Sequence, residues 1–320
     1  MKSWDLTTLG STMLSLSTEA GVPLLSSDGL RLDIAGAESN CAIALARLGK
    51  KVAWHSKVSQ GVLGRRVVSE IRSHGVDVSS VLWSESGRHE QMWVEAGLGT
   101  NCTTVTYDRT GAEIESLNIE EVALEALEDT TFFHATGITP ALSEDCRNTV
   151  LDTVQLARKA GVRVSFDVNY RAKLWGPARA REVLSTIIHG IDLLFVGAAD
   201  LSTIWQRSGD PRKDLPWLQD QFGIANVVLT RGEEGASGLF GGNFHRSSAF
   251  PGEVVSPIGA GDAFAAGVLY SLLEGEEELA LRRGCAMAAL ARESRGDYVV
   301  GGLEALKERM ENEGGKKLSR

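Results

Sequence analysis

The sequence predicts an α/β fold in which a doubly wound, mostly parallel sheet is flanked by helices and carries a small β-sheet lid. From about residue 130 onward, short apolar runs alternate with helical patterns, which is the signature of βαβ units around a parallel sheet. Earlier in the chain, short β-branched stretches are separated by Gly-rich turns. A length of 320 residues is sufficient for one large domain with a well-buried core.

Short apolar runs mark the strands of the predicted body. They lie at 131–135, 162–167, 191–196 and 226–230. Helical periodicity is present over 38–48, 63–74 and 142–160, and each of these segments is followed by a glycine suited to a left-handed cap. In such sheets ligands bind outside the carboxyl ends of the strands, so the residues after each run are the first candidates for a site.

The predicted lid comes from two segments, about 11–34 and 88–115. Neither segment has a long helix between its strands, which is typical of an antiparallel flap. We therefore expect residues 1–312 to form a single domain with this lid, and residues 313–320 to be a loose tail. An exposed lid sheet presents unpaired strand edges, so a homodimer through the lid is expected.

Composition excludes several classes of partner. The formal net charge is −9, which argues against a nucleic acid held through its phosphates. No apolar run approaches the ~20 residues that cross a bilayer, and no signal-peptide pattern is present. The cysteines lie far apart without CxxC spacing, which indicates a reducing compartment, so we expect a cytoplasmic protein without a membrane partner. They are Cys41, Cys102, Cys146 and Cys285.

One stretch, residues 256–267, joins a Gly-rich turn directly to a helix that runs to about Leu273. Small residues let the backbone amides at a helix start approach an anion, and these amides carry the positive end of the helix dipole. Asp262 lies at the same place and could accept the proton of an attacking hydroxyl. The alternative is that Asp262 is only the N-cap of the helix. No Walker sequence GxxxxGK[ST] occurs.

A second stretch, residues 35–49, also leads from a glycine turn into a helix. The first turn carries Glu38, Ser39 and Asn40, three hydrogen-bonding side chains that could bind the hydroxyls of a polyol. Its alternative reading is a capped helix that packs its Ala/Leu face on the sheet.

The two stretches together resemble the two signature regions of the ribokinase-like, or PfkB, family of carbohydrate kinases. They lie about 220 residues apart in the matching order, and the resemblance extends over about 7–302. Two further stretches, 137–142 and 165–175, are similar to segments of the 2-keto-3-deoxygluconate kinases. The resemblance implies transfer of the γ-phosphate of ATP to a primary hydroxyl of the sugar acid.

The resemblance also implies roles for individual residues. Asp262 would be the base, and Gly259, Ala260 and Gly261 would form the anion hole. The residues expected to bind the sugar are Gly36, Ala37, Glu38, Ser39, Asn40, Trp93, Tyr107, Arg109, Arg171 and Asp297. Those expected to bind the nucleotide are Asn169, Thr230, Arg231, Gly232 and Gly235, with Gly259 and Gly261.

Several of these residues have an ordinary alternative. Arginine offers planar paired donors for carboxylate or phosphate, but Arg109 and Arg171 could instead form surface ion pairs. Asp297 follows Gly296 and could equally be a turn residue.

Two positions depart from the pattern of the resemblance. Trp93 stands where these kinases usually have a tyrosine, and indole lacks the acceptor of a phenol. An Asn-x-x-Glu element associated with magnesium is replaced by residues 197–200, so Asp200 alone is expected to orient a Mg²⁺-bound water.

The leading hypothesis is an ATP-dependent 2-keto-3-deoxygluconate kinase that uses Mg²⁺. The alternatives are a kinase for another sugar, such as fructose, ribose or a nucleoside, and a non-catalytic sugar or nucleotide sensor. A dehydrogenase is disfavoured because no GxGxxG follows a strand near the N-terminus.

Overall fold

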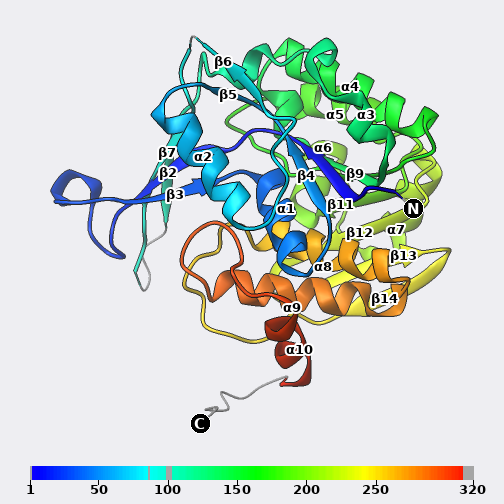
Figure 1. The fold of residues 1–320 in the computed structure, drawn as a ribbon. Coiled ribbons are helices and arrows are strands. Elements are labelled where there is room, and N and C mark those ends of the chain that lie inside the picture. Colours follow the sequence, from blue (N-terminus) through cyan, green and yellow to red (C-terminus); the bar gives the residue numbers. More distant parts are fainter. Residues whose placement is uncertain (1, 86, 99–102, 313–320) are drawn as a thin grey trace.

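A central sheet of eight strands organises the computed structural model, which describes residues 2–85, 87–98 and 103–312 (Figure 1). The strand order is β14-β13-β12-β11-β10-β9-β1-β4. Neighbouring strands from β12 to β4 are parallel, whereas the β12–β13 and β13–β14 pairs are antiparallel. The bounds are β1 (Trp4–Leu9), β4 (Val52–His55), β9 (Thr130–Thr136), β10 (Arg163–Asp167), β11 (Leu193–Gly197), β12 (Asn226–Thr230), β13 (Ala236–Phe240) and β14 (Asn243–Ser247).

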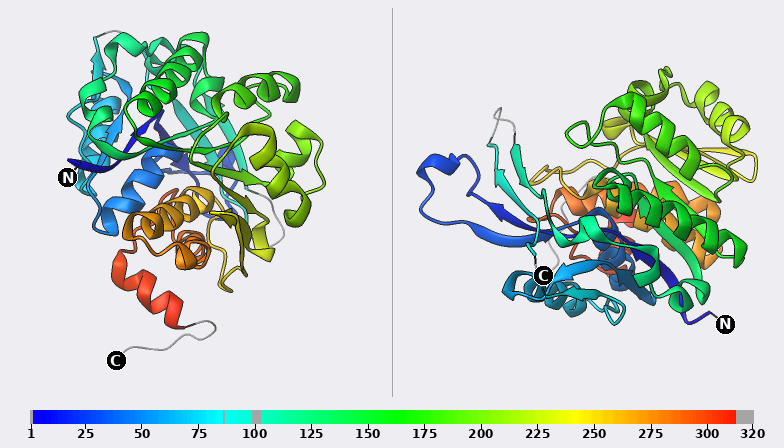
Figure 2. Two further views of the ribbon diagram at one scale, coloured as in Figure 1. Left: turned by 90° about the vertical axis from the view of Figure 1, so that its right-hand side faces the viewer. Right: turned by 90° about the horizontal axis from the view of Figure 1, so that it is seen from above.

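Helices cover both faces of this sheet (Figures 1 and 2). One layer contains α1 (Ala37–Arg47), α2 (Val62–Ser73), α8 (Ala260–Glu274), α9 (Ala280–Arg292) and α10 (Leu303–Glu311). The other contains α3 (Leu124–Glu128), α4 (Glu144–Lys159), α5 (Pro177–Ile187), α6 (Ala198–Trp205) and α7 (Pro211–Phe222). Phe132 packs in the first layer and Phe133 in the second, because successive side chains of a strand point to opposite faces. Strands buried on both faces read as continuous apolar runs, which is why the sequence revealed them.

The predicted α/β class is confirmed, and the four predicted body strands are present within one or two residues of their expected bounds. The alternation, however, begins at the N-terminus and not near residue 130, because β1 and β4 also belong to the parallel sheet. Both strands contain buried polar side chains, among them Thr7, Thr8 and His55. These polar residues interrupt the apolar runs by which the other strands were recognised.

A separate sheet of four strands projects from the body (Figure 2). Its strands are β2 (Met13–Ser17), β3 (Arg31–Ala35), β7 (Gln91–Glu95) and β8 (Thr104–Asp108), in the order β3-β2-β7-β8. The β2–β3 and β7–β8 pairs are antiparallel as expected, but the central β2–β7 pair is parallel. The prediction of an antiparallel flap was therefore wrong for the central pair, where the β2–β3 segment meets the β7–β8 segment. Positions 99–102, including Cys102, and the predicted tail 313–320 lie outside the described residues.

The two faces of this four-stranded sheet have different surroundings. Paired residues of neighbouring strands share a face, so the register sorts the side chains into two sets. The inner face carries Met13, Ser15, Asp33, Met92, Val94, Val105 and Tyr107, and its apolar members pack with Ile258 of the body. The outer face carries Leu14, Leu16, Leu32, Ile34 and Trp93. Near the body, Leu14 and Ile34 are covered by the core that includes α2, whereas Leu32 is 42% exposed.

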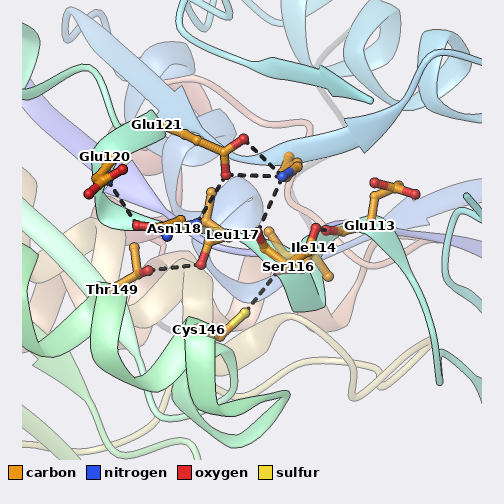
Figure 3. A network of polar contacts seen from close by, with 10 residues as sticks. Glu113, Ile114, Ser116, Leu117, Asn118, Glu120, Glu121, Cys146 and Thr149 are labelled. Carbon is orange, nitrogen blue, oxygen red and sulfur yellow. Dashed lines mark hydrogen bonds and ion pairs between the residues drawn. The ribbon is translucent and has the colours of Figure 1, made fainter. Parts of the chain in front are cut away.

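The chain returns from the four-stranded sheet to the body through two short 3-10 helices, η2 (Glu113–Ser116) and η3 (Ile119–Glu121) (Figure 3). Two side chains of α4 hold their backbone: the Thr149 hydroxyl donates to the Leu117 carbonyl at 2.9 Å and the Cys146 thiol to the Ile114 carbonyl at 2.9 Å. Lys57, in the short strand β5 (Lys57–Ser59) that pairs with β6 (Leu82–Ser84), donates to Glu121 at 2.9 Å. This end of the excursion is therefore fixed to the body.

Candidate active site

The predicted site residues converge at the carboxyl end of the central sheet, where the strand order reverses. β1 lies between β9 and β4, and the chain proceeds outward from β1 in both directions. Such a switch point leaves a crevice between the loops that follow the two neighbouring strands. Segments after β1, β9 and β10 meet the starts of α1 and α8 here.

Gly259 shapes the start of α8. It is the N-cap, with a left-handed φ of 78°, and the helix has no side-chain cap. A Cβ at this position would lie 1.9 Å from the Asp297 carbonyl oxygen, so only glycine fits for two independent reasons. Because the first backbone N–H groups of a helix have no partner within it, those of Ala260 and Gly261 are available to an anion.

Asp262 is in the first turn of α8 and Gly259 is the N-cap, so the alternative that Asp262 is the N-cap was wrong. Its carboxylate accepts a hydrogen bond from Asn40 Nδ2 at 2.8 Å and a longer one from Asn169 Nδ2 at 3.5 Å. Asn169 has a positive φ of 39°, a strained backbone conformation that is uncommon outside glycine and that gathers at functional sites. The two amides come from α1 and from the loop after β10, and together they orient the carboxylate.

Burial governs the electrostatics of this cluster. It raises the pKa of Asp262, while Asn40, Arg171 and Asn169 act in the opposite direction. Burial also raises the pKa of Asp167 to about 8, with further contributions from the charges of Asp262 and Asp200. Like charges close together disfavour ionisation of both. A carboxylate with a raised pKa is a stronger base than a solvated one, provided that it is deprotonated.

The start of α1 is held by contacts within the protein. Glu38 is fully buried and its Oε1 accepts from the hydroxyls of Thr136 at 2.9 Å and Thr139 at 3.0 Å. The Ser39 hydroxyl donates to the Gly36 carbonyl at 3.0 Å and accepts from the Thr12 hydroxyl at 2.7 Å.

Because of these hydrogen bonds, the residues of this stretch differ in whether they support the helix or face the site. Glu38 and Ser39 are engaged in fixing the helix, and the buried Ala37 offers no polar side chain. Gly36 touches the Ser11 carbonyl so closely that a Cβ would lie 2.4 Å from it. Asn40 is the member that reaches Asp262, and its Oδ1 is buried without a hydrogen-bond partner in the described part of the chain.

Asp297 joins the body to the inner face of the four-stranded sheet. Its side chain is buried, it accepts a hydrogen bond from Ser15, and burial raises its pKa to about 6. Its Oδ2 has no hydrogen-bond partner among the described residues. Unpaired acceptors at Asn40 and Asp297 suit a ligand that carries hydroxyl groups, since a buried acceptor without a donor is costly.

Three further predicted residues lie on or beside β8 and in the loop after β10. Tyr107 is on the inner face of β8, and the Arg109 guanidinium carbon lies 5.1 Å from its ring centroid. Arg109 Nε is 3.4 Å from Oε2 of the buried Glu90, so Arg109 forms an ion pair with a buried acid and not at the surface. Arg171 is exposed and its charge lowers the pKa of Asp262, Asp167 and Asp200.

Trp93 is not brought to this cluster. It pairs with Thr106 and Leu16 on the outer face, opposite to the face of Tyr107 and Ser15. The structure therefore places Trp93 on the face away from Tyr107, because a shift of one residue along a strand changes the face. The expectation that Trp93 binds the sugar stays a prediction.

The predicted nucleotide residues form a neighbouring group at the ends of β11 and β12. Thr230 pairs with Gly197, and Arg231 pairs its charge with Glu234 at 2.9 Å. Gly232 and Gly235 both have positive φ, at 57° and 91°. The segment is a glycine-dependent turn beside the sheet's carboxyl edge, which is compatible with close approach of a ligand to backbone.

Asp200 is in the first turn of α6, where its Oδ2 accepts from the Tyr170 N–H at 3.3 Å. Within 2–85, 87–98 and 103–312, no group of three or more His, Cys, Asp or Glu could hold a metal ion.

Some contributors gave no usable signal in the sequence. Thr136 and Glu90 are single polar residues whose partners lie 98 and 19 positions away, so no local pattern marks them. Asp167 had one, since it is an acid at the carboxyl end of a predicted parallel strand.

Comparisons with known proteins agree with this arrangement. The model of the pfkB family of carbohydrate kinases matches residues 5–300. The chain is 39% identical over 297 residues to a 2-dehydro-3-deoxygalactonokinase of Haloferax volcanii, covering 92% of this chain and 93% of that protein. It is 33% identical over 276 residues to a 2-dehydro-3-deoxygluconokinase of Bacillus subtilis, covering 82% of each. The crystal structure of 2-dehydro-3-deoxygluconokinase from Thermotoga maritima has a TM-score of 0.90 at 25% identity, covering 96% of this chain and 99% of that one.

No helix in the described part of the chain is long and apolar enough to cross a membrane. The cytoplasmic location stays a prediction.

Proposed function

The chain belongs to the pfkB family of carbohydrate kinases, and we propose that it transfers the γ-phosphoryl group of ATP to the primary hydroxyl of a 2-keto-3-deoxy sugar acid. The observation that carries this proposal is the Asp262 carboxylate, held by the side-chain amides of Asn40 and Asn169 at the uncapped start of α8. A sensor without turnover has no use for a base placed beside free helix N–H groups.

In the proposed reaction Asp262 accepts the proton of the sugar's primary hydroxyl as its oxygen attacks the γ-phosphorus. Asn40 and Asn169 orient the carboxylate, and Asn40 Oδ1 and Asp297 Oδ2 accept hydrogen bonds from sugar hydroxyls. The bond to the β-phosphate oxygen breaks, and ADP leaves with the electron pair.

The start of α8 is proposed to stabilise the charge of the transferring group. The N–H groups of Ala260 and Gly261 lie in the first turn of α8, at the positive end of the helix dipole. Donors that are already oriented stabilise developing charge without reorganisation. Thr230, Arg231 and the turn through Gly232 and Gly235 are proposed to hold the remainder of the nucleotide.

Mg²⁺ bound to the phosphates would neutralise charge on the nucleotide. We propose Asp200 as the residue that orients its water ligands, because its side chain is partly buried at the neighbouring strand end. Direct coordination is not required of the protein.

Two features support a sugar acid over a neutral sugar. Arg109 lies beside Tyr107 and the charge of Arg171 acts on Asp262, so two guanidinium groups are next to the proposed sugar site in a protein of net charge −9, and guanidinium binds carboxylate well. The relatives from Haloferax volcanii and Bacillus subtilis carry names of kinases for the galactonate and gluconate epimers of one sugar acid. The gluconate epimer is the substrate predicted from the sequence. The galactonate epimer is the second candidate, and the higher identity to the Haloferax volcanii kinase, 39% against 33%, supports it.

An ADP-release assay tests the proposal on 2-keto-3-deoxygluconate, its galactonate epimer, fructose and ribose. We expect higher kcat/KM for both acids than for both neutral sugars. Asp262→Asn removes the proton acceptor but keeps the shape, so we expect kcat to fall by roughly 10³-fold or more with substrate binding retained. Near-normal turnover of Asp262→Asn would refute the base, and a preference for fructose or ribose would refute the substrate class.

We also propose a homodimer through the outer face of the four-stranded sheet. Beyond the part that α2 covers, this face continues with Leu16, Leu32 and Trp93, and the neighbouring loops expose Leu25 and Leu98 at 103% and 62%. A patch of large apolar side chains at one end of a molecule is typical of an interface. A second copy would bury it by the same patch on both sides.

A further inference from the structure

A lysine of the body contacts the four-stranded sheet beside the proposed sugar site. Lys173 lies in the loop between β10 and α5, and its Nζ donates to the carbonyl oxygen of Val105 at 2.8 Å. The same ammonium lies 5.4 Å from the ring centroid of Tyr107. β8 is an edge strand of the sheet, so its outward carbonyls lack a neighbouring strand and can accept such a bond.

Tyr107 is consequently flanked by two cations. Arg109 contacts the ring at 5.1 Å and Lys173 at 5.4 Å, both within the range of a cation–π interaction. Arg109 is in turn held by the buried Glu90 at 3.4 Å and by the sulfur of Met13 at 3.6 Å. Lys173 is the member of this chain of contacts that comes from the body.

The loop that carries Lys173 also reaches the catalytic carboxylate. Asn169 donates to Asp262, and Arg171 lowers its pKa. The loop is braced internally by the Tyr170 hydroxyl, which donates to the Trp175 carbonyl at 2.9 Å. One short segment therefore contacts Asp262 at one end and the edge strand β8 at the other.

We propose that Lys173 is a positioning residue that fixes β8, and with it Tyr107 and Arg109, at the distance from Asp262 that the sugar acid requires. The effect is preorganisation, because the sheet edge is held before substrate arrives and less order has to be created on binding. The proposal rests on the proposed function for its effect on KM, but not for the contact itself.

Lys173→Met tests this role, because methionine keeps the length of the chain and removes the charge and the donor. We expect amide hydrogen exchange of 104–108 in the ligand-free protein to become faster, and KM for the sugar acid to rise about tenfold, with KM for ATP within about twofold of the parent. Lys173→Arg keeps both the donor and the cation and should restore most of the effect. Lys213→Met, at an exposed lysine paired with Asp210, is the matched control and should change neither quantity.

Unchanged exchange and unchanged KM in Lys173→Met would overturn the proposal. Faster exchange with an unchanged KM would show a tie without a positioning role, and a raised KM with unchanged exchange would show a direct contact with substrate; either result also overturns it. If the parent protein phosphorylates no sugar acid, the proposed function fails, whereas the exchange measurement still decides whether Lys173 holds β8.

Discussion

At the scale of single residues, two side-chain hydrogen bonds orient the carboxylate of Asp262. Asp262 receives a bond of 2.8 Å from Asn40 and one of 3.5 Å from Asn169. Hydrogen bonds to the charged form lower a pKa, whereas burial raises it. Asn40 thus opposes the burial that raises the pKa of Asp262.

Asn40→Ala removes the shorter of these bonds. We expect the pKa of Asp262 to rise further, so that the acid limb of the kcat/KM profile moves to higher pH. Asn169→Ala, which removes the longer bond, should move the limb less. The limb reports Asp262 coupled to Asp167, since the two charges interact. A limb that stays in place in Asn40→Ala would contradict the assignment of Asp262 as the titrating base.

The residue scale also shows what the sequence could predict. Asp262, Asn40 and Gly259 lie in two local patterns, each a glycine turn that opens a helix, and both patterns point to helix starts that the structure brings together. The roles of Glu38 and Ser39 as structural supports were not predictable, because their partners Thr136 and Thr12 lie on other elements. That Trp93 lies on the outer face of the sheet could not be predicted, because the face of a strand depends on register, which one sequence does not fix.

At the scale of elements, α8 has a left-handed glycine at each end, and only one of the two is in close contact with another segment. Gly259 and Gly275 are its two caps, with φ of 78° and 75°. A Cβ on Gly259 would meet the Asp297 carbonyl, whereas nothing lies within 4 Å of a Cβ on Gly275. Substitution of Gly275 therefore measures only the free-energy cost of a left-handed backbone, whereas substitution of Gly259 adds the cost of a steric clash.

Gly275→Ala should lower the free energy of unfolding by about 1 kcal/mol, the cost of a left-handed non-glycine residue. Gly259→Ala should lower it by about 3 kcal/mol or more, because the clash adds to that cost. Urea unfolding of the two variants measures the difference. Equal losses would show that Asp297 moves aside without penalty.

The strands that were predicted correctly are those with a continuous apolar sequence. Strands covered on both faces by helices are continuous apolar runs, and four of them were predicted. β1 and β4 were not, because the buried polar residues Thr7, Thr8 and His55 interrupt their apolar runs.

At the scale of the whole molecule, the buried acids set opposite demands for activity and stability. Burial raises the pKa of Glu38 from 4.5 to about 7, that of Asp297 to about 6 and that of Asp167 to about 8. Each of these acids therefore binds more protons in the folded protein than in the unfolded chain, and its contribution to stability decreases as pH rises from about 4 toward its folded pKa. Burial lowers the pKa of His55, His89 and His134 to about 4, so these residues act in the opposite direction below about pH 6.5. Deprotonation of Asp262 for catalysis requires a higher pH, so activity and the contribution of the buried acids to stability change in opposite directions.

Glu38→Gln isolates one of these acids at nearly constant shape. Glu38 contributes a loss of about 3 kcal/mol between pH 4.5 and pH 8, from a shift of about 2.5 units. We expect the free energy of unfolding of Glu38→Gln to fall less steeply over this range than that of the parent. Urea unfolding at pH 5, 6, 7 and 8 gives both slopes, and parallel slopes would mean that Glu38 is ionised throughout.

The assembly is the second property at this scale. Leu32→Glu places a charge in the exposed part of the sheet's outer face, so we expect the proposed dimer to dissociate into monomers in sedimentation analysis. Val254→Glu, at an apolar residue of 53% exposure outside that sheet, should leave the mass unchanged. A monomeric parent protein would contradict the proposed dimer.

The contact between Gly259 and Asp297 has a consequence for how the two reactants meet. One backbone touches the other with no space for a methyl group, so the turn proposed to receive the phosphate and the acid proposed to receive the sugar share a boundary of main-chain atoms. Their separation is set by van der Waals contact between main-chain atoms, which have no rotamers. A ligand longer or shorter by one carbon would have to change its own conformation, because these main-chain atoms cannot rearrange as a side chain can.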